Sequence, residues 1–101
     1  MNDRFLKFLG LTRKSGNLIA GANLSETALK RGKLSLIILA ADASDGTKHK
    51  FQAMAEFNKV EIIETATMDE LGYAIGKGQI SVIGVTDQRM SQKLKELCLA
   101  M

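Results

Sequence analysis

The chain has 101 residues, the length of one compact domain, and 46% of them are hydrophobic, enough for a core. Charged residues make up 25%, and the formal net charge is +3. A single cysteine excludes an internal disulfide, and no proline-rich, serine-rich or repeated segment indicates a linker. We therefore expect one domain over residues 1–101.

The charge is unevenly distributed along the chain. Residues 1–50 carry nine Lys and Arg against four Asp and Glu, whereas residues 51–101 carry five against seven. A basic half is compatible with a surface for RNA or phosphate, and also with an ordinary solvated surface of uneven charge. Charge alone does not decide between the two.

The N-terminus and the apolar runs indicate where the protein is found. In the first seven residues, charged side chains interrupt the apolar ones, so the apolar run of a signal peptide is lacking. The longest strongly apolar run, Leu36 to Ala41, is too short to cross a bilayer. We expect a soluble, cytoplasmic protein.

The first predicted element is an amphipathic helix over about the first dozen residues. Its apolar side is formed at helical spacing by Phe5, Phe8, Leu9 and Thr12. Gly16 ends this helix, and residues 18–20 form a short predicted strand.

A second helix is predicted after Gly21. Asn23 is a suitable N-cap, Glu26 three residues later completes a variant capping box, and Gly32 ends the helix. Residues 34–41 are nearly continuously apolar, which predicts a central strand covered on both faces.

The second half of the chain continues the alternation. A turn-like stretch precedes a third helix at residues 47–57, and a strand is predicted at residues 60–65. Thr67–Glu70 is a standard capping box for a fourth helix, and a further strand covers residues 80–86. The C-terminal helix is marked by Met90, Leu94, Leu97, Cys98 and Met101.

Helices therefore alternate with apolar strands from end to end. This pattern predicts an α/β fold, a three-layer α/β/α sandwich around a small mixed, mostly parallel sheet of about four strands. In such a sheet the functional loops lie at the carboxyl ends of the strands.

Metal binding and catalysis are not indicated. His49 and Cys98 are the single histidine and cysteine, so they cannot supply a zinc ligand set. We expect His49 to be exposed on a helix and Cys98 to lie in the core. The sequence has no Gly-x-Ser-x-Gly elbow, and we expect neither an enzyme nor a cofactor or metal.

Two glycine-rich segments remain. Gly72–Gly78 resembles a phosphate-binding loop but fails the Walker pattern, so a helix end at Gly76 followed by a turn explains it better. From that turn Lys77 would still reach a phosphate. Gly21–Thr27 leads into a helix N-terminus, whose unpaired N–H groups suit a phosphate or a base edge. Helix capping by Asn23 is the alternative interpretation of the second segment.

Four stretches of the chain together resemble the ribosomal protein family of the archaeal seven-Ae and eukaryotic thirty-e proteins, in particular its small free-standing bacterial branch. They are the glycine-led helix Gly21–Arg31, the strand and turn Leu36–Ser44, the Leu-Gly-x-Ala-x-Gly-Lys stretch at residues 71–77, and the strand end Val85–Asp87. The resemblance covers nearly the whole chain. It implies an α/β/α sandwich that binds kink-turn RNA or a related bent element.

The resemblance also implies where RNA is bound: at residues 21–27, at the turn of residues 41–44 and at the loop of residues 76–80. In seven-Ae-like members the second helix reads Gly-x-Asn-Glu-x-x-Lys, and the residues after the glycine contact tandem sheared G·A pairs. Here the glycine and the asparagine match, whereas Leu24 replaces the glutamate and Thr27 replaces the lysine.

We expect Asn23 to hydrogen-bond a base edge. The expected RNA-binding residues are Gly21, Ala22, Asn23, Leu24, Thr27, Asp42, Gly78 and Gln79, with Arg13, Lys14, Lys33 and Lys77 as phosphate contacts. The expected partner is ribosomal or other structured RNA and, with it, the ribosome; we expect no membrane partner and a monomer. An alternative is a ribosome-associated protein-interaction module that has lost tight kink-turn binding, which an exposed Leu24 would favour.

Overall fold

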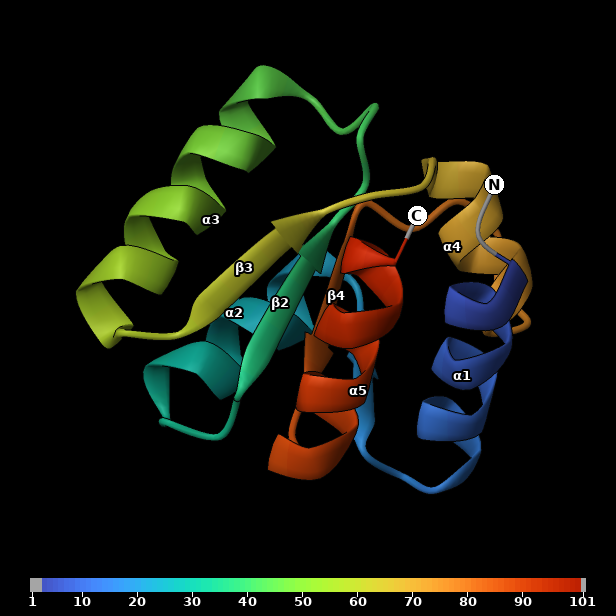
Figure 1. Cartoon of the computed structure of the whole chain (residues 1–101). Coiled ribbons are helices and arrows are strands. Elements are labelled where there is room, and N and C mark those ends of the chain that lie inside the picture. Colours follow the sequence, from blue (N-terminus) through green and yellow to red (C-terminus); the bar gives the residue numbers. More distant parts are fainter. Residues whose placement is uncertain (1–2, 101) are drawn as a thin grey trace.

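The computed structural model describes residues 3–100, and this range contains five helices that alternate with four strands (Figure 1). In chain order they are α1 (Asp3–Lys14), β1 (Leu18–Ala20), α2 (Ala22–Lys30), β2 (Leu36–Leu39), α3 (Asp45–Asn58), β3 (Glu61–Glu64), α4 (Met68–Ala74), β4 (Val82–Val85) and α5 (Gln88–Leu99). Every predicted helix and strand is present. Met101, the last residue of the predicted C-terminal stripe, lies outside the described residues.

The four strands form one mixed sheet in the order β1-β4-β2-β3. β2 and β3 are parallel, with Leu36 opposite Glu61. β4 is antiparallel to both of its neighbours, β1 and β2. The prediction of a mixed four-stranded sheet is confirmed, but the prediction that it is mostly parallel is wrong.

The direction of β4 follows from the connection that leads into it. After the short helix α4 the chain turns at Gly76 and returns alongside the helix, so that the Ile80 N–H donates to the Met68 carbonyl at 3.1 Å. The chain is then back at the edge of the sheet where β3 ended. β4 therefore starts from that edge and runs antiparallel to β2.

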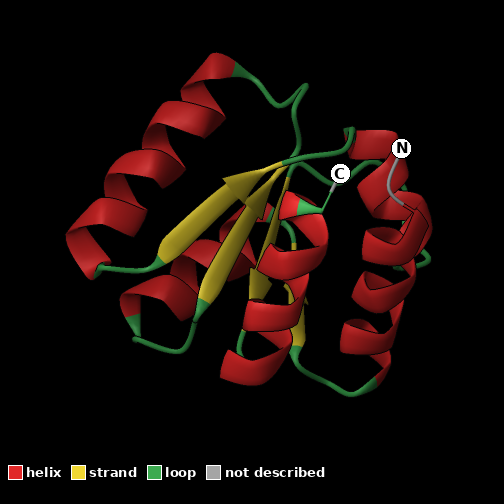
Figure 2. Cartoon of the chain, in the orientation of Figure 1, coloured by secondary structure: helices red, strands yellow, loops and turns green. Residues whose placement is uncertain are grey.

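The sheet lies between two layers of helices (Figure 2). Side chains of β2 alternate between the two cores, since Leu36 and Ile38 pack on the side of α1, α4 and α5, whereas Ile37 and Leu39 pack on the side of α2 and α3. All four are fully buried. The predicted three-layer sandwich with a doubly covered central strand is confirmed. None of the helices within residues 3–100 has the length and apolar character needed to span a membrane.

Side chains cap the starts of α3, α4 and α5. The predicted capping box of α4 is present: Glu70 N–H donates to the Thr67 hydroxyl at 3.1 Å, and Thr67 N–H donates to the Glu70 carboxylate at 2.9 Å. α3 begins earlier than predicted because the Ser44 hydroxyl accepts from the Thr47 N–H at 3.2 Å. Asp87 caps α5 in the same way.

Candidate nucleic-acid interface

The ends of three strands and the start of the fourth meet at one edge of the sheet. Because β1 and β2 are both antiparallel to β4, they point the same way, towards the upper edge in Figure 1. We call this edge, with residues 21–24, 40–44, 64–67 and 78–81, the rim. The structure thus brings together the start of α2, the turn after β2 and the loop before β4, as the resemblance implied.

Backbone hydrogen bonds hold these segments side by side. Gly21 N–H donates to the Val82 carbonyl at 2.9 Å, and Ala40 N–H donates to the Ser81 carbonyl at the same distance. Next to them, the Ala41 N–H donates to the Ala66 carbonyl at 2.7 Å. The rim is therefore a continuous, rigid extension of the sheet.

The start of α2 differs from the starts of α3, α4 and α5. Its N-cap is Gly21, which has φ 101° and provides no side-chain cap, and Asn23 is the second residue of the helix. The prediction that Asn23 caps α2 is therefore wrong. A positive φ of this size is unfavourable for any residue with a Cβ atom, so glycine sets the start of the helix. The first N–H groups of α2 have no partner within the helix and face the rim.

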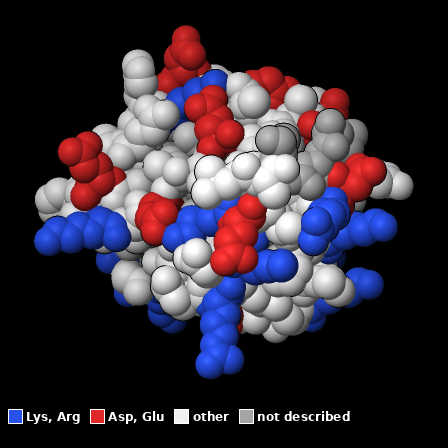
Figure 3. All heavy atoms as spheres, in the orientation of Figure 1, with Lys and Arg blue, Asp and Glu red and all other residues white. Residues whose placement is uncertain are grey.

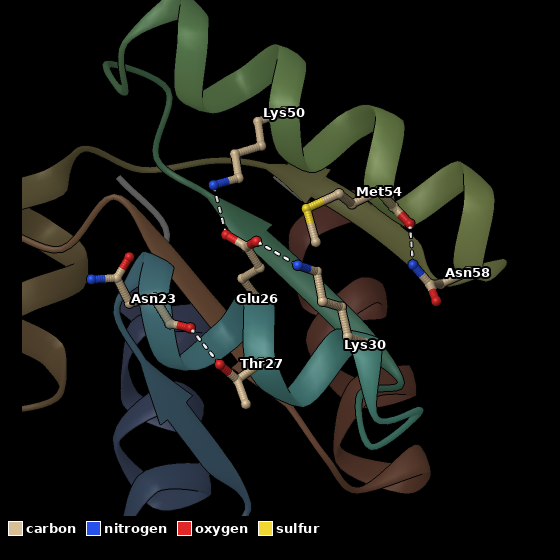
Figure 4. A network of polar contacts seen from close by, with 7 residues as sticks. All are labelled: Asn23, Glu26, Thr27, Lys30, Lys50, Met54 and Asn58. Carbon is tan, nitrogen blue, oxygen red and sulfur yellow. Dashed lines mark hydrogen bonds and ion pairs between the residues drawn. The ribbon is translucent and has the colours of Figure 1, made fainter.

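The side chains that follow Gly21 are open to solvent. Asn23 is exposed, and its amide makes no hydrogen bond among residues 3–100; Figure 4 shows it pointing away from the polar contacts of the helix. Leu24 is 66% exposed. Thr27 is exposed too, but its hydroxyl is engaged, because it donates to the Asn23 carbonyl at 3.2 Å. A free amide, an apolar side chain and unpaired N–H groups therefore lie together.

Glu26 does not take part in capping, contrary to the prediction. It joins α2 to α3 by ion pairs with Lys50 at 2.6 Å and Lys30 at 3.0 Å (Figure 4). Its side chain is 22% exposed. The hydrogen bond from Lys50, and then that from Lys30, holds the pKa of Glu26 below its ordinary value. The spacing of four residues in the sequence was a signal for the pair of Glu26 with Lys30. No pattern in the sequence indicated the pair with Lys50.

Asp42, in the turn after β2, and Lys48, in the first turn of α3, bind other parts of the rim. The Asp42 carboxylate accepts from the Met68 N–H at 2.8 Å, so the predicted RNA contact Asp42 also links this turn to the first residue of α4. The Lys48 ammonium donates to the Ala41 carbonyl at 2.7 Å and pairs with Glu64 at 2.5 Å. Lys48 was missed because nothing in the sequence places it beside β3.

The loop before β4 packs tightly along α4. A Cβ atom on Gly72 would lie 1.5 Å from the Gly78 carbonyl oxygen, so a glycine is required at position 72 for the chain to return. The Gln79 amide donates to the Asp69 carboxylate at 3.0 Å. Gly76 has φ 74° and follows the end of α4, which confirms the predicted helix end. Lys77 and Gly78 are exposed.

The predicted phosphate contacts do not all lie at the rim. Lys33 precedes β2, at the opposite edge of the sheet. Arg13 and Lys14 are the last residues of α1, also near that edge. The Arg13 guanidinium nevertheless extends to Gly76, where a Cβ atom added to the glycine would lie 3.7 Å from it. Lys77 is the one of the four that directly precedes the rim. Basic and acidic side chains are interspersed on the face shown in Figure 3, with Lys and Arg mainly in its lower half.

Of the two side chains considered for metal binding, His49 lies as predicted, whereas Cys98 is less buried than predicted. His49 is exposed on α3, and Cys98 is partly buried against the core. Within residues 3–100, no three His, Cys, Asp or Glu side chains form a group that could hold a metal ion.

A sequence profile of the ribosomal protein L7Ae/L30e/S12e/Gadd45 family matches residues 3–95. The chain belongs to this family. It is 30% identical to the RNA-binding protein YlxQ of Enterococcus faecium over 92 residues, 91% of this chain and 88% of that protein. It is 31% identical over 78 residues to the large ribosomal subunit protein eL8 of Halobacterium salinarum, covering 75% of this chain and 64% of eL8.

A solved structure has a closely similar fold. A protein of unknown function from Bacillus halodurans C superposes on this family member with a TM-score of 0.90 at 33% identity, over 93% of this chain and 95% of that one. The resemblance inferred from the four stretches is thereby confirmed.

Proposed function

We propose that this protein binds a bent, structured RNA of the kink-turn type at the rim, and that it acts by binding, in the cytoplasm and in association with the ribosome. The observation that carries the proposal is the uncapped start of α2, led by Gly21 and followed by the free amide of Asn23. Membership of a ribosomal protein family supports it, as does the identity to a protein named as RNA-binding.

Each part of the α2 start has a physical role in this proposal. The N–H groups and the positive end of the helix dipole attract a phosphate or a base acceptor. The Asn23 amide combines one acceptor with two donor hydrogens, so it makes two hydrogen bonds to one base edge. Bent RNA displays unstacked bases and sugar edges, which a rigid rim recognises by shape.

The experiment compares two RNAs of equal length and composition, one folded as a kink-turn and one a straight duplex. Fluorescence anisotropy at fixed salt gives both affinities. We expect the kink-turn to bind at least about tenfold more tightly, a difference of about 1.4 kcal/mol. Equal affinities would contradict recognition of a bent RNA.

One observation favours a second candidate function, a ribosome-associated protein-interaction module. Leu24, 66% exposed at the rim, stands where seven-Ae-like members carry a glutamate. The double variant Leu24→Glu, Thr27→Lys tests this alternative, since both side chains are exposed and their replacement leaves the core intact. If the rim is an RNA site, the variant binds the kink-turn more tightly than the parent. If the parent does not bind the kink-turn RNA and the folded variant does not bind it either, the result favours the protein-interaction module.

A further inference from the structure

A groove of about 620 Å³ lies between α1 and α4, away from the start of α2. Its floor is formed where the two helices approach closely, since a Cβ atom on Gly10 would lie 3.0 Å from the Ala74 carbonyl oxygen. Leu11 from α1 and Tyr73 from α4 border it and are 54% and 89% exposed. Two large apolar side chains thus stand open to solvent on either side of a groove with a mainly apolar lining.

The groove has an acidic and a basic end. Gly10 lies beside Ala74 and Arg13 beside Gly76, so α1 and α4 run in the same direction. The starts of both helices therefore lie at one end of the groove, where its lining includes three carboxylates, Asp3, Asp69 and Glu70. The lining also includes the Lys7 ammonium, one helical turn after Asp3, and at the other end the Lys14 ammonium.

We propose that this groove binds an amphipathic α-helix of a partner protein, with the basic, amino-terminal turn of that helix at the acidic end of the groove. The seven residues of α4 extend over about 10 Å, which matches about two turns of a docked helix. Apolar side chains at i, i+3 or i+4 and i+7 of that helix would lie between Leu11 and Tyr73.

Charge distinguishes a helix from a nucleic acid as the occupant. Three carboxylates and two ammonium groups line the groove, and this mixture repels a phosphate backbone at one end. A helix with basic residues first and acidic residues last matches the charged side chains at both ends. The proposal does not depend on RNA binding at the rim.

The probe is a designed, fluorescently labelled peptide of about 14 residues, long enough for about four helical turns. It carries leucines at helical spacing, lysines in its first turn and glutamates in its last. A second peptide has the same composition with the charges exchanged. We expect saturable binding of the first peptide by anisotropy and at least about fivefold weaker binding of the second. Amide NMR shifts should be confined to α1 and α4.

Variants locate the binding site. Leu11→Gln and Tyr73→Gln should each weaken peptide binding by about tenfold, because each removes an apolar contact from the groove. The matched control is Phe57→Gln on α3, where an aromatic side chain is 87% exposed far from the groove, and peptide affinity should stay unchanged.

Three results would overturn the proposal. The first is that neither peptide binds saturably. The second is that Phe57→Gln weakens peptide binding as much as Leu11→Gln and Tyr73→Gln do. The third is that a single-stranded oligouridine displaces the peptide and shifts the Tyr73 amide resonance. The last would assign the groove to RNA. Because the assay contains no kink-turn RNA, failure here leaves the function proposed for the rim unaffected.

Discussion

Asn23 is the residue at which binding can be separated from folding. Gly21, not Asn23, occupies the N-cap position of α2, so Asn23→Ala should change the free energy of unfolding by no more than about 0.5 kcal/mol. Loss of a two-point contact to a base should cost about 1–3 kcal/mol of binding free energy, about 5- to 150-fold in affinity. Urea unfolding and RNA titration at fixed salt measure the two quantities. Parental affinity in the variant would show that Asn23 contacts no base.

The same residue shows why a local pattern can be misinterpreted. Asn23 and Glu26 have the spacing of a capping box, as do Thr67 and Glu70, yet only the second pair forms one. The difference is Gly21, whose hydrogen bond to β4 and positive φ start the helix two residues earlier. That bond joins residues far apart in the sequence, so the local pattern could not reveal it.

At the scale of elements, the ion pairs of Glu26 join α2 to α3 and make stability depend on pH. The pKa of Glu26 lies below its ordinary value of 4.5 in the folded protein, because of the hydrogen bonds from Lys50 and then Lys30. A lowered folded-state pKa gives stability that is complete above the ordinary value and is lost as the pH falls through the folded value.

Glu26→Gln should therefore lower the melting temperature at about pH 7, and this deficit should be smaller at about pH 3, because protonation of the parent carboxyl weakens its ion pairs as the pH falls. Thermal unfolding at both pH values checks this. The matched control is Glu56→Gln on α3, an exposed glutamate with no ion pair among the described residues, which should melt like the parent at both. A deficit in Glu26→Gln that persists undiminished at low pH would mean that the ion pairs are not its cause.

The start of α4 is joined to the rim, whereas the start of α5 is not. The first turn of α4 binds the side chains of Asp42 and Gln79, and α5 begins at the opposite edge of the sheet. Thr67→Ala and Asp87→Ala each remove one helix cap, so each should cost about 0.5–2 kcal/mol of stability. Thr67→Ala should also weaken RNA binding several-fold, and Asp87→Ala should not. Equal RNA affinities of the two folded variants would show that the start of α4 does not contribute to the RNA site.

At the scale of the whole molecule, the layers could be predicted from the sequence but the charge pattern could not. Alternating helices and apolar strands fix a three-layer sandwich, because each apolar face needs cover. The basic first half of the chain, however, does not become a basic rim. Arg13 and Lys14 close α1, and Lys33 lies in the loop between α2 and β2. Both places are where the chain reverses at the edge opposite the rim. Lys48, which was not predicted, is at the rim but is held by Glu64.

This charge arrangement predicts a weak salt dependence of RNA binding. A rim with few free cations makes about two or three phosphate contacts, and each contributes about 0.7–0.9 to the slope of log affinity against log salt. Lys77→Ala, beside the rim, should lower the slope by about one contact. Lys33→Ala, at the opposite edge, should leave it unchanged. Titrations over a range of salt concentrations measure all three slopes. A flat response of the parent would favour a protein partner, and an equal loss in both variants would mean that the RNA reaches both edges of the sheet.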